Sequence, residues 1–258
     1  MKHKEAYVIQ DLSEREHLIL NRLMAQGTVS VADLSEELAV SEVTVRSDLT
    51  NLEELGLLSR THGGALPSIH PHIFQRQNMH TEEKHRIAKT AADLIQNGDA
   101  VFIEAGTTTS FVPRYLSGKR DILIITNSIQ AFESAKTNPA LKITLIGGEF
   151  RDSTDSFVGS IAIEAIRRFN VRYAFVGTDG FSLHSGITTH LIEGGDIISV
   201  MRERAQKLVL LADSSKYGKS GVVTILPMSD IDILITDNGI KPEQTEELKQ
   251  NPIEIITC

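Results

Sequence analysis

Cysteine, long apolar runs and surplus positive charge are all scarce or missing in this chain. Its single cysteine is Cys258, the last residue, which excludes a disulfide within the monomer and argues against a Cys/His zinc site. No apolar run approaches the roughly 20 residues that a membrane-spanning helix needs, and residues 1–16 lack the apolar core of a secretory signal. The net charge of −8 at pH 7 leaves no basic tail. We expect a cytoplasmic protein with neither a membrane partner nor a metal.

A nucleotide cofactor is not predicted either. Gly218, Lys219 and Ser220 match the end of a phosphate-binding loop, but the glycine that such a loop needs upstream would fall at Asp213. The letters GGEF at 147–150 follow an apolar run and are explained by a backbone turn. The sequence therefore predicts no cofactor.

The chain is long enough for a small module and a larger domain with its own core. Residues 65–80 carry two prolines and show little periodicity. We expect a small domain at 1–64, a linker at 65–80 and a larger domain at 81–258. His70 and His72 lie in this linker without a nearby Cys or carboxylate, so a solvated linker explains them better than a metal site.

Residues 28–64 predict two helices joined by a tight turn and followed by a ribbon. Ser30 can cap the first helix, with Asp33 three residues on. Ser41 can cap the second, along which apolar residues recur at spacings of three and four. These are Val45, Leu49, Leu52 and Leu55. An earlier helix begins after Ser13. Its inward residues are expected to be Leu18, Ile19, Leu23 and Met24.

The helix after Ser41 has the features of a helix that reads DNA. Its first turn is small and polar, and only Ala39 and Val40 separate it from the preceding helix. Such a helix can enter the major groove and meet base edges with the side chains near its N-terminus. The residues expected to face DNA are Ser41, Glu42, Thr44, Arg46 and Ser47.

The ribbon that follows is a candidate wing. Gly56 suits the end of a helix, and LLSRTHGGA then alternates like a strand and turns at Gly63 and Gly64. The tip residues are expected to contact phosphates. They are Arg60, Thr61 and His62.

The charge of this region opposes DNA binding. Residues 1–67 contain six Lys or Arg against eleven Asp or Glu. Bulk electrostatics would therefore repel a duplex, and binding must depend on a few local cations, helix N-termini and backbone amides.

The larger domain is predicted to have an α/β fold. A helix is expected from residue 81, with Gly98 just past its end. It is followed by apolar runs that are continuous, as in strands covered on both faces. The candidate strands are 100–104, 122–126, 142–146, 173–177, 207–212, 222–226 and 232–236. Helical patterns lie between several of them, at 108–117, 128–137, 157–169 and 191–205. This alternation predicts a mostly parallel sheet, in which ligands bind at the carboxyl ends of the strands.

Small polar residues gather at those strand ends. A strand, a turn rich in Gly, Thr and Ser, and a helix N-terminus together direct amides and hydroxyls toward an anion. We therefore expect a small phosphorylated ligand in one shared crevice. The candidate residues are Glu104, Gly106, Thr107, Thr108, Thr109, Asn127, Ser128, Gly147, Gly148, Asp179 and Lys216.

These motifs resemble a known family. VSEVTVRSDLTNLEELGLLSRTHGGA is similar to the signature of DeoR-type bacterial transcriptional regulators, and EAGTTT, ITNS, LIGGEFR, FVGTDG and LLADSSKYGK are similar to the effector domain of that family. The sequence departs from the family pattern in two places. Ser47 follows Arg46 where the family usually has a second arginine, and Glu104 lies near the place of a frequent aspartate.

The resemblance implies a winged helix-turn-helix and an effector domain with a fold similar to ribose-phosphate isomerases. It implies a repressor, less often an activator, of a sugar-utilisation operon that responds to a phosphorylated sugar. The turn from Gly106 to Thr109 would hold the phosphate, with Asn127, Gly147, Gly148 and Lys216 near it. Operator DNA would be bound by a homodimer or homotetramer, because two DNA-binding domains match the two half-sites of an operator.

Two other functions remain open from the sequence. A sugar-phosphate isomerase or hydrolase could draw a general base and an electrophile from Glu104, Asp179, Glu193 and Lys216. An adaptor whose acidic winged domain never meets DNA would explain the charge deficit.

Overall fold

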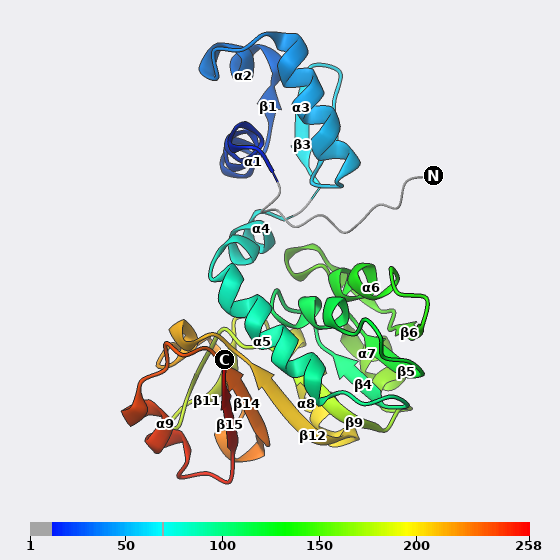
Figure 1. The fold of residues 1–258 in the computed structure, drawn as a ribbon, viewed down its shortest axis with the longest axis vertical. Coiled ribbons are helices and arrows are strands. Elements are labelled where there is room, and N and C mark those ends of the chain that lie inside the picture. The colour runs from blue at the N-terminus through cyan, green and yellow to red at the C-terminus, as the bar shows by residue number, and fades with distance from the viewer. Residues whose placement is uncertain (1–11, 69) are drawn as a thin grey trace. The chain divides into compact units, whose positions relative to one another are not determined.

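The computed structural model describes residues 12–68 and 70–258, which form two compact units, the first ending at Met79 and the second beginning at His80 (Figure 1). Each unit has its own hydrophobic core. No helix in the described ranges is long and apolar enough to cross a bilayer.

The first unit is a winged helix-turn-helix. Its elements are α1 (Glu14–Gln26), β1 (Val29–Ser30), α2 (Val31–Glu37), α3 (Glu42–Glu54), β2 (Leu58–Arg60), β3 (Gly64–Pro67) and α4 (Pro71–Asn78). The three strands form an antiparallel sheet in the order β1-β3-β2. The helices pack over a core that includes Ile19, Leu23, Leu34, Val45, Leu49 and Leu52. The predicted helices and wing are thus confirmed.

The predicted helix caps are present as well. Ser13 and Glu16 form a reciprocal capping box at α1, and the Ser30 and Ser41 side chains accept hydrogen bonds at the starts of α2 and α3. Gly56, just past α3, has φ of +74°, a conformation that glycine adopts without strain.

The prediction that Leu18 of α1 is a core residue was wrong. Leu18 is 55% exposed, and Leu20 is buried in its place. With Ile19 and Leu23 inward, the buried stripe of the helix extends toward Leu20 and Met24, which leaves Leu18 on its outer side.

The predicted linker at 65–80 holds regular structure instead. β3 pairs with both β1 and β2, so the wing extends to Pro67. His70 caps α4 with its side chain, Pro71 occupies the first turn of that helix, and Phe74 joins the core of the first unit. A helix of eight residues is too short to display a clear period, and proline is favoured in a first helical turn rather than excluded from it.

The second unit is built on a seven-stranded, fully parallel sheet in the order β15-β14-β12-β9-β4-β5-β6. These strands are β4 (Ala100–Ile103), β5 (Ile122–Thr126), β6 (Leu141–Leu145), β9 (Val171–Val176), β12 (Ala205–Leu211), β14 (Ile233–Thr236) and β15 (Glu254–Thr257). The chain runs outward from β4 through β5 and β6 and then returns to β9 on the other side of β4. β4 and β9 therefore meet at a switch point, where sheets of this kind bind ligands.

Helices cover both faces of this sheet. They are α5 (Thr81–Leu94), the 3-10 helix η2 (Thr109–Tyr115), α6 (Ile129–Ala135), α7 (Gly159–Ile166) and α8 (Ile192–Arg204). In β4, Val101 and Ile103 join the apolar cluster of α5, η2 and α6, whereas Phe102 joins the cluster of α7 and α8. This alternation explains why the strands read as continuous apolar runs.

Several elements of the second unit differ from the prediction. The run at 222–226 forms β13 (Val223–Leu226) in a small antiparallel sheet with β10 (Gly180–Ser182) and β11 (Gly186–Thr189), not in the main sheet. Three features were not predicted from the sequence: β15, α9 (Pro242–Leu248) and the hairpin of β7 (Glu149–Arg151) and β8 (Ser156–Val158). The segment at 108–117 is a 3-10 helix that contains Pro113 rather than an α-helix.

Candidate functional site

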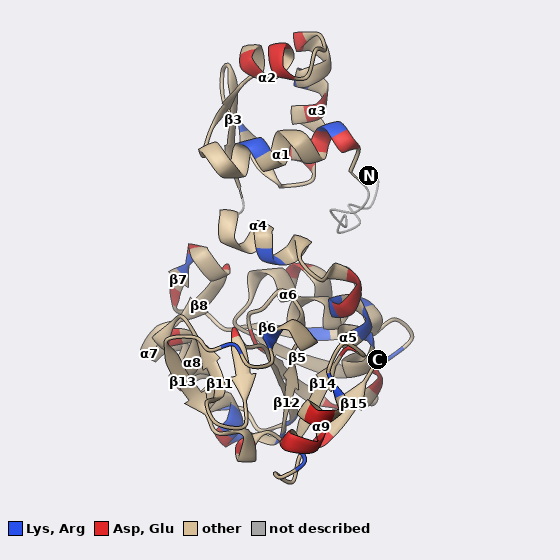
Figure 2. Ribbon diagram, turned by 90° about the vertical axis from the view of Figure 1, so that its left-hand side faces the viewer, with Lys and Arg blue, Asp and Glu red and all other residues tan. Residues whose placement is uncertain are grey.

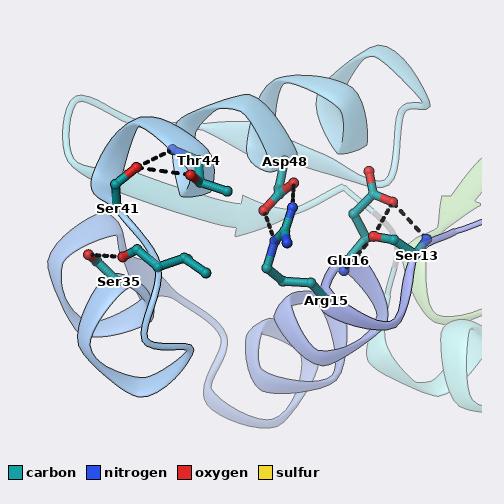
Figure 3. Close-up of polar contacts among 8 residues, drawn as sticks. Ser13, Arg15, Glu16, Ser35, Ser41, Thr44 and Asp48 are labelled. Carbon is teal, nitrogen blue, oxygen red and sulfur yellow. Dashed lines mark hydrogen bonds and ion pairs between the residues drawn. The ribbon is translucent and has the colours of Figure 1, made fainter.

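The N-terminal turn of α3 presents a small polar surface to solvent. Ser41 Oγ accepts a hydrogen bond from the backbone N of Thr44 at 3.2 Å and lies 2.9 Å from Thr44 Oγ1 (Figure 3). Glu42, Arg46 and Ser47 are exposed on the same helix. The predicted DNA-facing residues of α3 thus lie together at one end of the helix, although Thr44 is only partly exposed.

The position of α3 is fixed by the turn before it and by an ion pair with α1. The turn before it places Ala39 at φ of +52°, and Ser35 Oγ donates to the carbonyl of Val40 at 2.6 Å. On the inward side, Arg15 of α1 donates to both carboxylate oxygens of Asp48, from Nε at 2.6 Å and Nη2 at 2.9 Å (Figure 3). Asp48 is only 5% exposed, so this forked pair anchors the middle of α3 to α1.

All four arginines between residues 12 and 68 pair with a nearby carboxylate. Arg46 lies 3.0 Å from Glu42 one turn earlier, and Arg60 lies 3.8 Å from Glu53 while its guanidinium also donates to the hydroxyl of Thr50. The other two pairs are Arg15–Asp48 and Arg22–Glu37. Acidic residues cover much of α2 as well (Figure 2). A duplex that approaches α3 must therefore compete with carboxylates for each of these cations.

The wing tip is exposed and its base is tightly packed. Thr61, His62 and Gly63 are all exposed, and the backbone N of Thr61 donates to Gly64 O at 2.9 Å. A Cβ on Gly64 would lie 1.8 Å from the carbonyl oxygen of Val29, so this position of β3 requires glycine.

Val43 also belongs to this surface, although the sequence did not predict it. Val43 is 77% exposed in the first turn of α3, between two residues that were predicted to face DNA. Its position off the buried stripe of Val45, Leu49 and Leu52 was the signal that could have identified it.

In the second unit, the switch point is bridged by a buried carboxylate. Glu104, directly after β4, is 6% exposed, and its Oε2 accepts a hydrogen bond from the backbone N of Gly177 at 3.3 Å. Its own backbone N donates to Phe175 O at 3.0 Å. The ends of β4 and β9 are thereby held together at the place where a ligand is expected.

The turn after Glu104 is closed by its own side chains. Thr109 Oγ1 lies 2.7 Å from Glu104 O and 3.0 Å from Gly106 O, and the backbone N of Ser110 donates to Gly106 O at 3.0 Å. The hydroxyl proton of Thr109 is therefore used within the turn. Thr107 and Thr108 are 7% and 8% exposed at its outer edge.

The end of β5 is covered by the β7–β8 hairpin. Asn127 and Ser128 are each 1% exposed, and Ser128 Oγ caps α6 by accepting from the backbone N of Ala131 at 3.2 Å. Asn127 pairs with Phe157 of β8 through both its backbone and its side chain.

The remaining predicted residues lie at the same edge of the sheet. Gly147 is exposed after β6, whereas a Cβ on Gly148 would meet the Val158 carbonyl oxygen at 2.5 Å. Asp179, after β9, accepts a hydrogen bond from the backbone N of His190 at 2.9 Å. Lys216 lies after β12 in the short helix η4 (Ser214–Lys216).

Asp237, which the sequence analysis did not select, also lies at this edge, after β14. It accepts hydrogen bonds from the backbone N atoms of Ser214 at 2.6 Å and Gly239 at 2.8 Å. Burial by itself raises the pKa of Asp237, but these hydrogen bonds outweigh it and hold the pKa below the ordinary value of 3.8. Across residues 12–68 and 70–258, no group of three or more His, Cys, Asp or Glu could hold a metal ion.

Both units match family models. Residues 15–69 match the DeoR-like helix-turn-helix domain, and residues 79–238 match the DeoR C terminal sensor domain. The chain belongs to the DeoR family. It is therefore a transcriptional regulator with an N-terminal DNA-binding domain and a C-terminal sensor domain.

Two relatives of similar sequence align along nearly their whole length. The lactose phosphotransferase system repressor of Lactococcus lactis subsp. lactis is 36% identical over 90% of this chain and 93% of its own. The HTH-type transcriptional repressor GlcR of Bacillus subtilis (strain 168) is 33% identical over 94% of this chain and 95% of its own. Among solved structures, a D-ribose-5-phosphate isomerase in complex with phospho-erythronic acid has 19% identity and a TM-score of 0.39 over 53% of this chain and 54% of its own.

Proposed function

We propose that this DeoR-family chain represses a carbohydrate-utilisation operon and releases its operator when a phosphorylated sugar binds the sensor domain. The observation that carries the proposal is the presence, in one chain, of a capped and exposed α3 beside a wing and of a Thr-rich turn at a switch point. The names of the two relatives support it, since one is a lactose system repressor and both are repressors.

The proposed DNA site joins the start of α3 to the wing. Arg46 leaves Glu42 to donate to a guanine, and Val43 contacts the methyl group of a thymine. Ser41, Glu42, Thr44 and Ser47 meet neighbouring base edges or phosphates. Arg60, Thr61 and His62 at the wing contact the phosphate backbone.

The proposed effector site lies at the switch point. The phosphate contacts the backbone amides from Gly106 to Thr109, the hydroxyls of Thr107 and Thr108, and the ammonium group of Lys216. Gly147, Gly148 and Ser128 border this region, while Glu104 and Asp179 accept hydrogen bonds from sugar hydroxyls. Asn127 lies beside them.

Regulation follows from a population shift. Sugar phosphate binds one arrangement of the paired subunits more tightly. In that arrangement, the distance between the two DNA-binding domains does not match the distance between the operator half-sites. A homodimer is the smallest assembly with two readers, and a homotetramer would satisfy the same requirement. In this proposal the sensor domain catalyses no reaction and needs no cofactor.

An electrophoretic mobility-shift assay on the DNA upstream of the chain's own gene tests the proposal. The protein should retard this fragment but not a shuffled one, and one member of a panel of pentose and hexose phosphates should release it. NMR of the same mixtures follows the sugars themselves. Catalytic turnover would favour an isomerase-like enzyme, and failure to bind any fragment would favour an adaptor.

A further inference from the structure

The side-chain oxygen of Asn127 is buried and has no hydrogen-bond partner among residues 12–68 and 70–258. Its Nδ2 donates to the carbonyl of Phe157 at 3.0 Å, and its backbone O accepts from the backbone N of Phe157 at 2.9 Å. The residue is 1% exposed, yet its Oδ1 finds no hydrogen-bond partner among the described residues. Buried polar atoms are nearly always paired, so an orphaned acceptor at a candidate site indicates a missing donor.

The chemistry of that donor follows from the orientation of the amide. The nitrogen and oxygen of an asparagine side chain are assigned from their surroundings. Here the carbonyl of Phe157 can only accept, so the Nδ2 group must face it. Oδ1 is therefore available only as a hydrogen-bond acceptor and has no proton of its own to donate.

A phosphate group does not fit this oxygen. A phosphate dianion offers acceptor oxygens, which would face Oδ1 without a proton between them. The neighbouring strand β4 also ends in a side chain that accepts hydrogen bonds. Ile103 of β4 is in register with Thr126 of β5, so the next residues, Glu104 and Asn127, follow the two strands at the same level. A carboxylate and an amide oxygen thus lie at adjacent strand ends, and both favour a hydroxyl over an anion.

We infer that the end of β5 is a hydroxyl-recognition subsite, in which Asn127 Oδ1 accepts a hydrogen bond from a sugar hydroxyl while the phosphate is bound elsewhere. This inference rests on the proposed function, since it divides the effector into a phosphate end and a polyol end. It also changes the role of Asn127, which the family resemblance places near the phosphate.

The subsite is attached to the β7–β8 hairpin. Besides the two Phe157 contacts, the backbone N of Ile129 donates to Asp155 O at 3.0 Å, and Arg151 of the hairpin forms an ion pair with Glu193 in the first turn of α8. Because Asn127 is enclosed, a ligand can reach Oδ1 only if the hairpin or an adjacent loop moves.

Isothermal titration calorimetry on the full chain tests the inference. The probes are inorganic phosphate, ribose 5-phosphate with 2-deoxyribose 5-phosphate, and glucose 6-phosphate with its 2-, 3- and 4-deoxy analogues. For the sugar phosphate that binds, at least one monodeoxy analogue should bind the wild type about tenfold more weakly or worse, because it leaves the buried acceptor unpaired.

The variant Asn127→Leu should remove this discrimination, so that parent and deoxy compounds bind alike, while the affinity for inorganic phosphate stays unchanged. Asn138→Leu is the matched control, because its side-chain nitrogen also donates to a carbonyl but its oxygen is paired with the Ala140 N, before β6 and away from the strand ends of the site. This control should discriminate as the wild type does.

The wild type alone can overturn the inference, whatever happens to the variant's folding, if it binds every deoxy analogue as tightly as the parent. Equal weakening of phosphate and sugar phosphates by Asn127→Leu, with discrimination retained, would also overturn it and leave the proposed function intact. Binding of none of the sugar phosphates would instead refute the proposed function itself, together with the subsite.

Discussion

Arg46 is the residue of α3 best placed to read a base, and it is restrained by Glu42. We expect Arg46→Ala to weaken binding to the upstream fragment by about 1–3 kcal/mol, the usual value of a base contact from arginine. Glu42→Gln should strengthen non-specific binding several-fold at low salt, because it frees the guanidinium, which now lies 3.0 Å from Glu42. Fluorescence anisotropy with labelled duplexes measures both effects. Unchanged affinity in Arg46→Ala would contradict the assignment of α3 to the major groove.

The buried Asp48 stabilises the winged helix-turn-helix by binding Arg15. Asp48→Asn should lower the free energy of unfolding by about 1–3 kcal/mol, because a buried, charge-assisted bidentate contact with Arg15 is lost. Glu37→Gln, which breaks the exposed pair with Arg22 at 3.3 Å, is the matched control and should cost about 0.5 kcal/mol or less. Urea denaturation followed by far-UV circular dichroism compares the two. Equal effects would show that burial of Asp48 does not matter.

His85 makes stability depend on pH in the second unit. Burial, and secondarily the charge of Arg114, lowers the pKa of His85 below its ordinary value of 6.5. The unfolded chain therefore takes up a proton that the folded chain resists, and stability should fall as the pH drops below about 6.5. His85→Phe keeps an aromatic ring against Phe111, whose centroid lies 4.2 Å away. Thermal unfolding at several pH values should show a smaller acid-side loss in this variant than in the wild type.

At the scale of elements, two neighbouring glycines of the wing test how closely β3 packs against β1. Gly64→Ala should destabilise the reader and weaken DNA binding, because its Cβ would overlap the Val29 carbonyl oxygen at 1.8 Å and force β3 away from β1. Gly63→Ala, with open space around its Cβ, should change the unfolding midpoint little. Denaturation and anisotropy of both variants measure this difference. Similar behaviour of the two alanines would argue against a tight β1–β3 contact.

Elements that carry a local signal could be predicted from the sequence. The caps at Ser13, Ser30 and Ser41 and the apolar stripe of α3 follow from residues a few positions apart. Strand β13 was predicted as a strand, but its partner depends on a hairpin between β10 and β11 that no local pattern reveals. Likewise, the β7–β8 hairpin has strands of only three residues, which is too short for an alternating pattern.

At the scale of the whole molecule, sensing and DNA binding should be separable. Thr108→Arg should abolish release by sugar phosphate while the DNA affinity persists, because a long cationic side chain replaces a small one that is 8% exposed in the turn proposed to bind phosphate. Thr137→Arg is the control, since Thr137 is exposed after α6. The mobility-shift assay with and without the sugar panel compares them. Retained release in Thr108→Arg would contradict the assigned phosphate turn.

The sequence predicted the strand ends and helix starts on which the candidate residues lie but did not reveal the partners of their side chains. Strand ends rich in Thr, Gly and Asn are visible in the sequence, whereas the hydrogen bond from Asn127 to Phe157 joins residues 30 positions apart. Asp237 was missed for a related reason, because its contacts with Ser214 depend on the neighbouring placement of β12 and β14.

The pairing of every arginine from residue 12 to 68 has a consequence for how the protein distributes itself in a cell. Chromosomal DNA offers a vast excess of wrong sites, which normally sequester regulators through phosphate contacts alone. A DNA-binding domain in which these four arginines are already paired with carboxylates gains little from such contacts. Most copies would then diffuse freely and respond to the effector in solution, so a small number of molecules would suffice to occupy the operator.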